Sequence, residues 1–175
     1  MALHHTPPPE RIAPLTTDVA ETPQRGASAP ADTSWTTGLP VLEGSMLTLR
    51  ELRVSDAPTL FAMLASGEAA RFVSAPPTDV AGVERFIEWT ISERASGTHA
   101  CFGIVPHGMT DAVGIMQIRQ NEVHFRTAEW GFALGAAFWG RGLFAEAAQL
   151  ALDFAFGVLR IHRLEARAAV KNGRG

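Results

Sequence analysis

One stretch decides the fold: AEWGFALGAAFWGRGLFAEA, residues 128–147. Its first seven residues alternate between two faces, with Ala128, Trp130, Phe132 and Leu134 on one and Glu129, Gly131 and Ala133 on the other. A period of two is that of a β-strand. A glycine-containing turn at residues 140–142 follows, and apolar residues then recur at helical spacing. The stretch therefore predicts a strand, a tight turn and a helix that begins near Leu143.

The helix that starts near Leu143 extends to about Leu159. Its main apolar face consists of Leu143, Ala147, Leu150, Ala151, Phe154 and Val158. Polar side chains are confined to Glu146, Gln149 and Asp153. A helix this apolar is mostly buried, most simply against a sheet.

The rest of the chain predicts further helices and strands around this unit. Ser55 and Thr78 are candidate caps for two helices that end near Gly67 and Gly97. Asp56, next to Ser55, is expected to interact with the positive end of the first helix. Strand patterns occur at a segment beginning near Met46 and at His99–Val105, Val113–Ile118, Phe125–Leu134 and Arg160–Val170. The middle three, joined by short turns, suggest an antiparallel meander. The expected fold is α/β (α+β), with a mixed, mostly antiparallel sheet flanked by helices.

The amino-acid composition excludes several classes of function and indicates a cellular compartment. The 175 residues carry a net charge of −3, and 46% are hydrophobic. A mildly acidic chain lacks the basic surface of a general nucleic-acid-binding protein, and no apolar run is long enough to span a bilayer. Cys101 is the single cysteine, which excludes an internal disulfide and a cysteine-based zinc site. We expect a cytoplasmic protein without a metal.

The amino-terminal segment differs from the remainder. Seven of the eleven prolines lie within its first 40 residues, among Ala, Thr and Ser. Such a segment buries too little apolar surface to offset the entropy cost of ordering. We therefore predict a disordered extension over residues 1–44 and a domain over residues 45–175.

The turn at residues 140–142 has the properties of an anion site. Gly140 and Gly142 let the backbone approach a ligand closely, and Arg141 adds a permanent positive charge. The turn leads into a helix start, whose free N–H groups favour phosphate. The alternative is that the glycines only shape the turn. Neither a P-loop nor a dinucleotide-binding fingerprint is present.

The run from Ala128 to Ala147, taken with residues 47–57 upstream and residues 162–172 downstream, resembles the GCN5-related N-acetyltransferases (GNAT), in particular their Rim-type branch. The resemblance covers about residues 46–175. It implies a sheet that opens beside its fourth strand to hold acetyl-CoA. The implied cofactor-binding residues are Phe132, Ala133, Leu134, Trp139, Gly140, Arg141, Gly142, Leu143, Phe144 and Asn172.

In that comparison, the backbone of residues 132–134 would pair with the pantetheine arm. The amides of residues 141–144 would hold the pyrophosphate, and Asn172 would reach the pantetheine or the reacting end. Trp139 stands where the family signature has Gln or Arg, and Phe144 stands where it has a small residue. The loop binds mainly through its backbone, so both departures are compatible with the assignment.

The implied reaction is acetyl transfer from a thioester to an amine. Glu129 is the candidate base, directly or through water, and a backbone N–H in residues 132–134 is the candidate oxyanion donor. The alternative for Glu129 is an exposed or ion-paired strand carboxylate. The chain has no tyrosine, and Gly175 occupies a position where the branch often has a serine, so no general acid is evident and solvent would protonate the thiolate.

The family pattern normally continues past the position of Gly175 through another helix and two strands. We therefore expect a fold that lacks these elements. The alternatives to an active enzyme are a non-catalytic acyl-CoA-binding module and an inactive fragment. The expected acceptor is a protein N-terminal amine or a small amine. The protein is expected to be a monomer or a homodimer. Trp89 either borders the acceptor pocket or packs on the surface. His162, Glu146 and Cys101 are expected to be structural.

Overall fold

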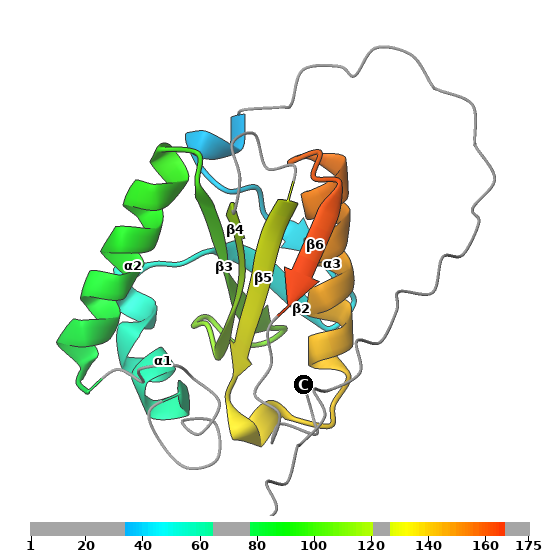
Figure 1. Ribbon diagram of the computed structural model, residues 1–175. Helices are drawn as coiled ribbons and strands as arrows, with labels where there is room; N and C mark the ends of the chain where they lie inside the picture. The colour runs from blue at the N-terminus through cyan, green and yellow to red at the C-terminus, as the bar shows by residue number, and fades with distance from the viewer. Residues whose placement is uncertain (1–33, 65–77, 121–126, 167–175) are drawn as a thin grey trace, which may run out of the picture.

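The computed structural model describes residues 34–64, 78–120 and 127–166, and its strands form one six-stranded sheet (Figure 1). The strands are β1 (Leu42–Glu43), β2 (Leu47–Glu51), β3 (His99–Pro106), β4 (Gly114–Gln120), β5 (Thr127–Leu134) and β6 (Arg163–Ala166). Their order in the sheet is their order in the chain. All neighbours are antiparallel except β5 and β6, which are parallel. The predicted mixed, mostly antiparallel sheet is confirmed.

Helices cover both faces of the sheet, as the apolar patterns required. Helices α1 (Ala57–Leu64) and α2 (Val80–Ala95) lie on one side, and α3 (Leu143–Gly157) lies on the other (Figure 1). Helix α3 makes the crossover between β5 and β6, which is why these two strands run parallel. The predicted α/β architecture is therefore correct, and the turn before α3 lies at one end of the sheet.

Each face of the sheet has its own hydrophobic core. Under α3, Phe102 and Phe154 meet edge to face with ring centroids 5.0 Å apart, and Ala128 and Leu134 of β5 belong to the same cluster. Ala133 packs instead against the cluster under α1 and α2. The two faces of β5 thus separate as the alternation predicts, because successive side chains on a strand point to opposite sides.

Both predicted helix caps were wrong. Ser55 lies inside the 3-10 turn η2 (Val54–Asp56), which begins after Arg53, and its side chain is exposed. The cap of α2 is Asp79, which accepts a hydrogen bond from the N–H of Gly82 at 2.6 Å, and not its neighbour Thr78. A carboxylate interacts with the positive end of a helix more strongly than a hydroxyl does, which favours Asp79 over Thr78 as the cap of α2.

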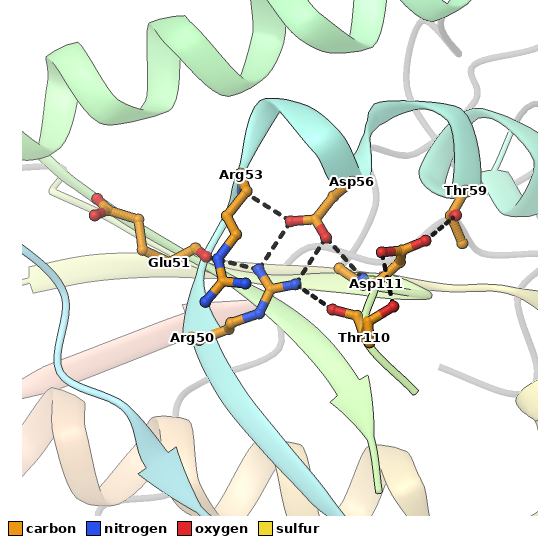
Figure 2. Close-up of polar contacts among 8 residues, drawn as sticks. Arg50, Glu51, Arg53, Asp56, Thr59, Thr110 and Asp111 are labelled. Atoms are coloured by element: carbon orange, nitrogen blue, oxygen red, sulfur yellow. Dashed lines mark hydrogen bonds and ion pairs between the residues drawn. The ribbon is translucent and has the colours of Figure 1, made fainter. Parts of the chain in front are cut away.

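Asp56 has a different role from the one its position in a helix start predicts. Its carboxylate is fully buried and receives two hydrogen bonds from the Arg50 guanidinium, at 2.7 and 2.8 Å. The backbone N–H groups of Arg53 and Ala112 donate to it at 2.7 and 3.0 Å. Arg50 also reaches the carbonyl of Thr110 (Figure 2). The cluster ties β2, η2 and the β3–β4 turn together.

The ordered structure begins earlier than predicted. The 3-10 turn η1 (Ser34–Thr36) places Trp35 in the core under α3, where it is 5% exposed, and the guanidinium of Arg94 donates to the carbonyl of Thr36. Strand β1 then joins the sheet edge. Residues 34–44 were therefore wrongly assigned to a disordered extension, because two large apolar side chains, Trp35 and Leu39, are buried there. Residues 1–33 lie outside the described part of the chain.

The predicted last strand, residues 160–170, begins later than expected. Arg160 has φ 55°, a left-handed turn conformation, and β6 starts at Arg163. Residues beyond 166 lie outside the described part. Within residues 34–64, 78–120 and 127–166, no helix has the length and hydropathy needed to cross a bilayer, and no group of three or more metal-ligating side chains occurs.

Candidate active site

The site predicted from the sequence lies where β5 ends and α3 begins. After Leu134 the chain makes the short 3-10 turn η5 (Ala136–Phe138) and reaches Trp139. The indole Nε1–H of Trp139 donates to the carbonyl of Leu134 at 2.8 Å. Trp139 therefore braces the turn against the end of β5. This contact gives the tryptophan in the signature a structural role.

The glycines of the turn adopt conformations that suit no other residue well. Gly140 has φ 71° and Gly142 has φ 80°, both in the left-handed region. Both glycines are exposed, as is Arg141, whose guanidinium lies 5.6 Å from the centre of the Phe138 ring. Gly142 is the N-cap residue of α3, and no side chain caps this helix start in the described residues. The first amides of α3 thus begin at an exposed, cationic turn.

A carboxylate fixes the first turn of α3 without capping it. Glu146 accepts hydrogen bonds from the N–H of Ser45 at 2.6 Å, the hydroxyl of Ser45 at 2.5 Å and the N–H of Met46 at 2.9 Å. These bonds, first among them the bond from the Ser45 side chain, lower the pKa of Glu146 below 4.5. Gly44 is required alongside, because a Cβ there would lie 2.7 Å from the Glu146 carboxyl carbon. The predicted structural role of Glu146 is confirmed.

Strand β5 places the candidate base, Glu129, between two neighbouring strands of the sheet. In the described residues, the β5–β6 register runs from Thr127↔Arg163 to Trp130↔Ala166. Glu129 lies inside this paired part, opposite Arg119 of β4 on one side and Glu165 of β6 on the other. It is half-buried and shares its face with Gly131 and Ala133. The predicted segment Phe132–Leu134 follows just beyond this register.

The two phenylalanines of the predicted cofactor set, Phe132 and Phe144, meet on the α3 side. The rings of Phe132 and Phe144 lie 4.2 Å apart, and the ring of Trp130 lies 6.3 Å from that of Phe144. Phe132 remains 37% exposed. The side chain of Phe144 thus links the first turn of α3 to β5, and Leu143 beside it is buried in the core. The predicted cofactor residues from 132 to 144 therefore lie along one continuous path, and Asn172 is outside the described residues.

The remaining sequence candidates are Cys101, His162 and Trp89, and none of them lies in the turn or on β5. Cys101 is buried on β3, and burial raises the pKa of its thiol to about 12. His162 is exposed. Trp89 is 40% exposed, with its ring 6.0 Å from that of Phe86 and under the Arg119 guanidinium at 5.6 Å. It packs on the surface beside β4.

Two polar residues on the α1/α2 face were missed by the sequence analysis. His99 on β3 is 1% exposed, and its Nε2 lies 3.1 Å from Oε1 of Gln117 on β4. Gln117 is opposite Gly131 in the β4–β5 register. The only signal in the sequence is that each of the two residues is polar and adjoins apolar residues of its strand.

Comparisons with known proteins agree with this geometry. The family model described as "Acetyltransferase (GNAT) domain" matches residues 46–174. A relative from Bacillus licheniformis, named uncharacterized N-acetyltransferase p20, is 28% identical over 127 residues, covering 72% of this chain and 71% of the relative.

Solved structures share the fold. RimJ of Mycobacterium smegmatis, in complex with a coenzyme A disulfide, aligns with a TM-score of 0.64 at 22% identity, covering 76% of this chain and 66% of that one. RimL, a ribosomal L7/L12 α-N-protein acetyltransferase in complex with coenzyme A, aligns with a TM-score of 0.66 at 19% identity, covering 76% and 77%. The family match spans most of the chain and includes both β5 and the turn before α3. The chain belongs to the GNAT acetyltransferase family.

Proposed function

We propose that this chain transfers the acetyl group of acetyl-CoA to a primary amine, with a protein N-terminal α-amine as the acceptor. The observation that carries the proposal is the exposed turn Gly140–Gly142, which leads into the uncapped start of α3 next to the end of β5. Membership of the GNAT family supplies the acetyl-CoA chemistry. The name of the similar RimL structure, a ribosomal L7/L12 α-N-protein acetyltransferase, supports an N-terminal amine as acceptor.

The residues of the turn fit a pyrophosphate. Both glycines are exposed. A Cβ built on Gly140 would meet nothing within 4 Å, and one built on Gly142 would meet only the end of the Met46 side chain at 3.4 Å. The first-turn amides of α3 then donate toward the same side, and the helix dipole favours an anion there. Arg141 adds a positive charge at the turn. The backbone of residues 132–134 would pair with the pantetheine arm, which directs the thioester toward Glu129 and Gly131.

The chemistry needs one proton acceptor and one oxyanion donor. Glu129, directly or through a water, removes the proton from the acceptor ammonium so that its nitrogen can attack the acetyl carbon. A backbone N–H in residues 132–134 stabilises the oxygen of the tetrahedral intermediate. A C–N bond forms and the C–S bond breaks. The thiolate is a good leaving group and takes its proton from solvent.

The experiment is a thiol-release assay with acetyl-CoA and peptides that carry a free N-terminus. We expect turnover by the protein and a loss of about 100-fold in kcat for Glu129→Gln, the lower end of general-base contributions. The affinity for acetyl-CoA should not change. Glu88→Gln, at an exposed position of α2, is the matched control and should keep full activity.

Binding of acetyl-CoA without thiol release across a panel of amines would contradict transfer and favour a non-catalytic acyl-CoA-binding module. Full activity in Glu129→Gln would remove Glu129 from the mechanism. Absence of acetyl-CoA binding would contradict the proposed function altogether.

A further inference from the structure

His99 is a buried polar residue whose hydrogen bonding is incomplete. It is 1% exposed, and its Nδ1 is the one buried side-chain nitrogen or oxygen in residues 34–64, 78–120 and 127–166 that has no hydrogen-bond partner. An unsatisfied buried polar atom is costly and calls for an explanation. The contact made by the other ring nitrogen, Nε2, provides such an explanation.

Nε2 of His99 lies 3.1 Å from Oε1 of Gln117. With the carbonyl oxygen as acceptor, Nε2 carries the hydrogen and Nδ1 is the unprotonated nitrogen. Burial lowers the pKa of His99 to about 4, and the nearby charge of Arg119 acts in the same direction. The ring of Trp89 holds the imidazole from the α2 side at 5.1 Å between centroids. His99 is therefore a neutral, fixed donor to Gln117.

The bond from His99 determines where the other end of the Gln117 amide lies. A Cβ built on Gly131 would be 3.1 Å from Nε2 of Gln117, so the NH₂ group lies over the bare Cα of this glycine. Gln117 and Gly131 are directly opposite in the β4–β5 register, and Glu129 is the next residue of β5 on the same face. Diagonal neighbours of this kind have Cβ atoms roughly 7 Å apart. Gln117 is half-buried, and its amide nitrogen over Gly131 lies on the sheet face that also carries the candidate base.

We propose that Gln117 binds the acceptor by donating a hydrogen bond from its amide NH₂ to the carbonyl oxygen next to the reacting amine, and that His99 is the positioning residue for this amide. The inference rests on the proposed function, because it assigns a further residue to the same site. Glu129 receives the proton of the amine while Gln117 holds the carbonyl of the same acceptor residue. The preferred substrate class is then an α-amine with an adjacent carbonyl, and not an isolated alkylamine.

The test compares two acceptors of the same shape near the nitrogen. Alaninamide has the carbonyl, and isopropylamine lacks it. Thiol release from acetyl-CoA gives kcat/KM for each acceptor with the wild-type protein, with Gln117→Met and with the control Gln149→Met, an exposed glutamine on α3. Each acceptor is compared only between proteins, so the different basicities of the two amines cancel.

We expect Gln117→Met to lower kcat/KM for alaninamide about tenfold, the loss of one hydrogen bond to a neutral group, mainly through KM. The value for isopropylamine should stay within about twofold, and the KM of acetyl-CoA should not change. Gln149→Met should match the wild type. An equal loss with both acceptors, or no loss with either, would overturn the role of Gln117 and leave the transferase reaction in place.

His99 is tested by separating its effect on activity from its effect on stability. His99→Phe keeps a ring against Trp89 and removes the unpaired nitrogen, but it also removes the bond to Gln117. Because these two effects oppose each other, urea unfolding should show a free energy close to that of the wild type. The kcat/KM for alaninamide should still fall several-fold, and His99→Gln, which can donate to Gln117, should restore part of it. Unchanged kcat/KM in His99→Phe would overturn the positioning role. No thiol release by the wild type with any amine would overturn the proposed function and this inference with it.

Discussion

The buried pair of Arg50 and Asp56 gives the sharpest stability prediction. Asp56 is 0% exposed and receives two bonds from Arg50 and two from backbone N–H groups. Asp56→Asn keeps the shape but removes the charge and replaces one acceptor oxygen with a donor. Breaking a buried ion pair by removing one partner costs about 3–5 kcal/mol. Because asparagine keeps one acceptor, we expect about 3 kcal/mol, or a fall in Tm of about 10 °C.

The pH dependence gives this prediction an independent check. Burial acts to raise the pKa of Asp56, but the bonds from Arg50 and the two N–H groups outweigh it, and the pKa lies below 3.8. A lowered folded-state pKa contributes stability that is fully present above the unfolded-state pKa and is lost as the pH falls through the folded-state value. The difference between the wild type and Asp56→Asn should therefore be full at pH 7 and shrink below about pH 4.

Urea denaturation from pH 3 to pH 7 measures both effects. The control is Asp153→Asn, at an exposed position of α3 where a change within about 0.5 kcal/mol is expected. Equal m-values would show that the variants differ in stability alone. A loss below about 1 kcal/mol for Asp56→Asn, or one that stays constant with pH, would refute the reasoning.

Three further predictions concern the turn, the first turn of α3 and the cysteine. Gly142→Ala places a side chain on a residue with φ 80°, so we expect the free energy of unfolding to fall by about 1–2 kcal/mol. Titration calorimetry should also show weaker acetyl-CoA binding. The control Gly157→Ala, with open space around it, should change neither stability nor binding. Glu146→Gln should lower stability in urea by about 1 kcal/mol at pH 7. Because the pKa of Glu146 is lowered from 4.5, this difference should begin to shrink below pH 4.5 and be lost as the pH falls through the lower folded-state pKa. A constant difference would be contrary evidence. Cys101, with a pKa of about 12, should react with iodoacetamide only after unfolding, and rapid labelling of the folded protein would show that the thiol is not buried.

The elements predicted best from the sequence are those whose buried apolar residues recur at regular helix or strand spacing. Helix α3 was predicted to start at Leu143 and does, because Leu143, Ala147, Ala151 and Phe154 recur at helical spacing and are all buried. The two faces of β5 were predicted from strict alternation. A tight turn at residues 140–142 was also predicted, and its two glycines adopt φ 71° and 80°, which glycine reaches without strain.

Features that depend on residues far apart in the chain could not be predicted in the same way. Asp56 looked like a residue of a helix start, and its real partners, Arg50 and the N–H of Ala112, are brought to it by β2 and the β3–β4 turn. Trp35 is buried although its neighbours resemble a flexible extension, because the core under α3 covers it. The contact between His99 and Gln117 requires the β3–β4 register.

The central claim is that main-chain amides at the start of α3 bind the pyrophosphate of coenzyme A. The most direct measurement is an amide NMR titration of the protein with coenzyme A and, separately, with pantetheine, which lacks the pyrophosphate. The account predicts large shifts of the amide signals of residues 140–144 with coenzyme A, and small ones there with pantetheine. Binding of coenzyme A that leaves these amides unmoved and shifts others instead would contradict it.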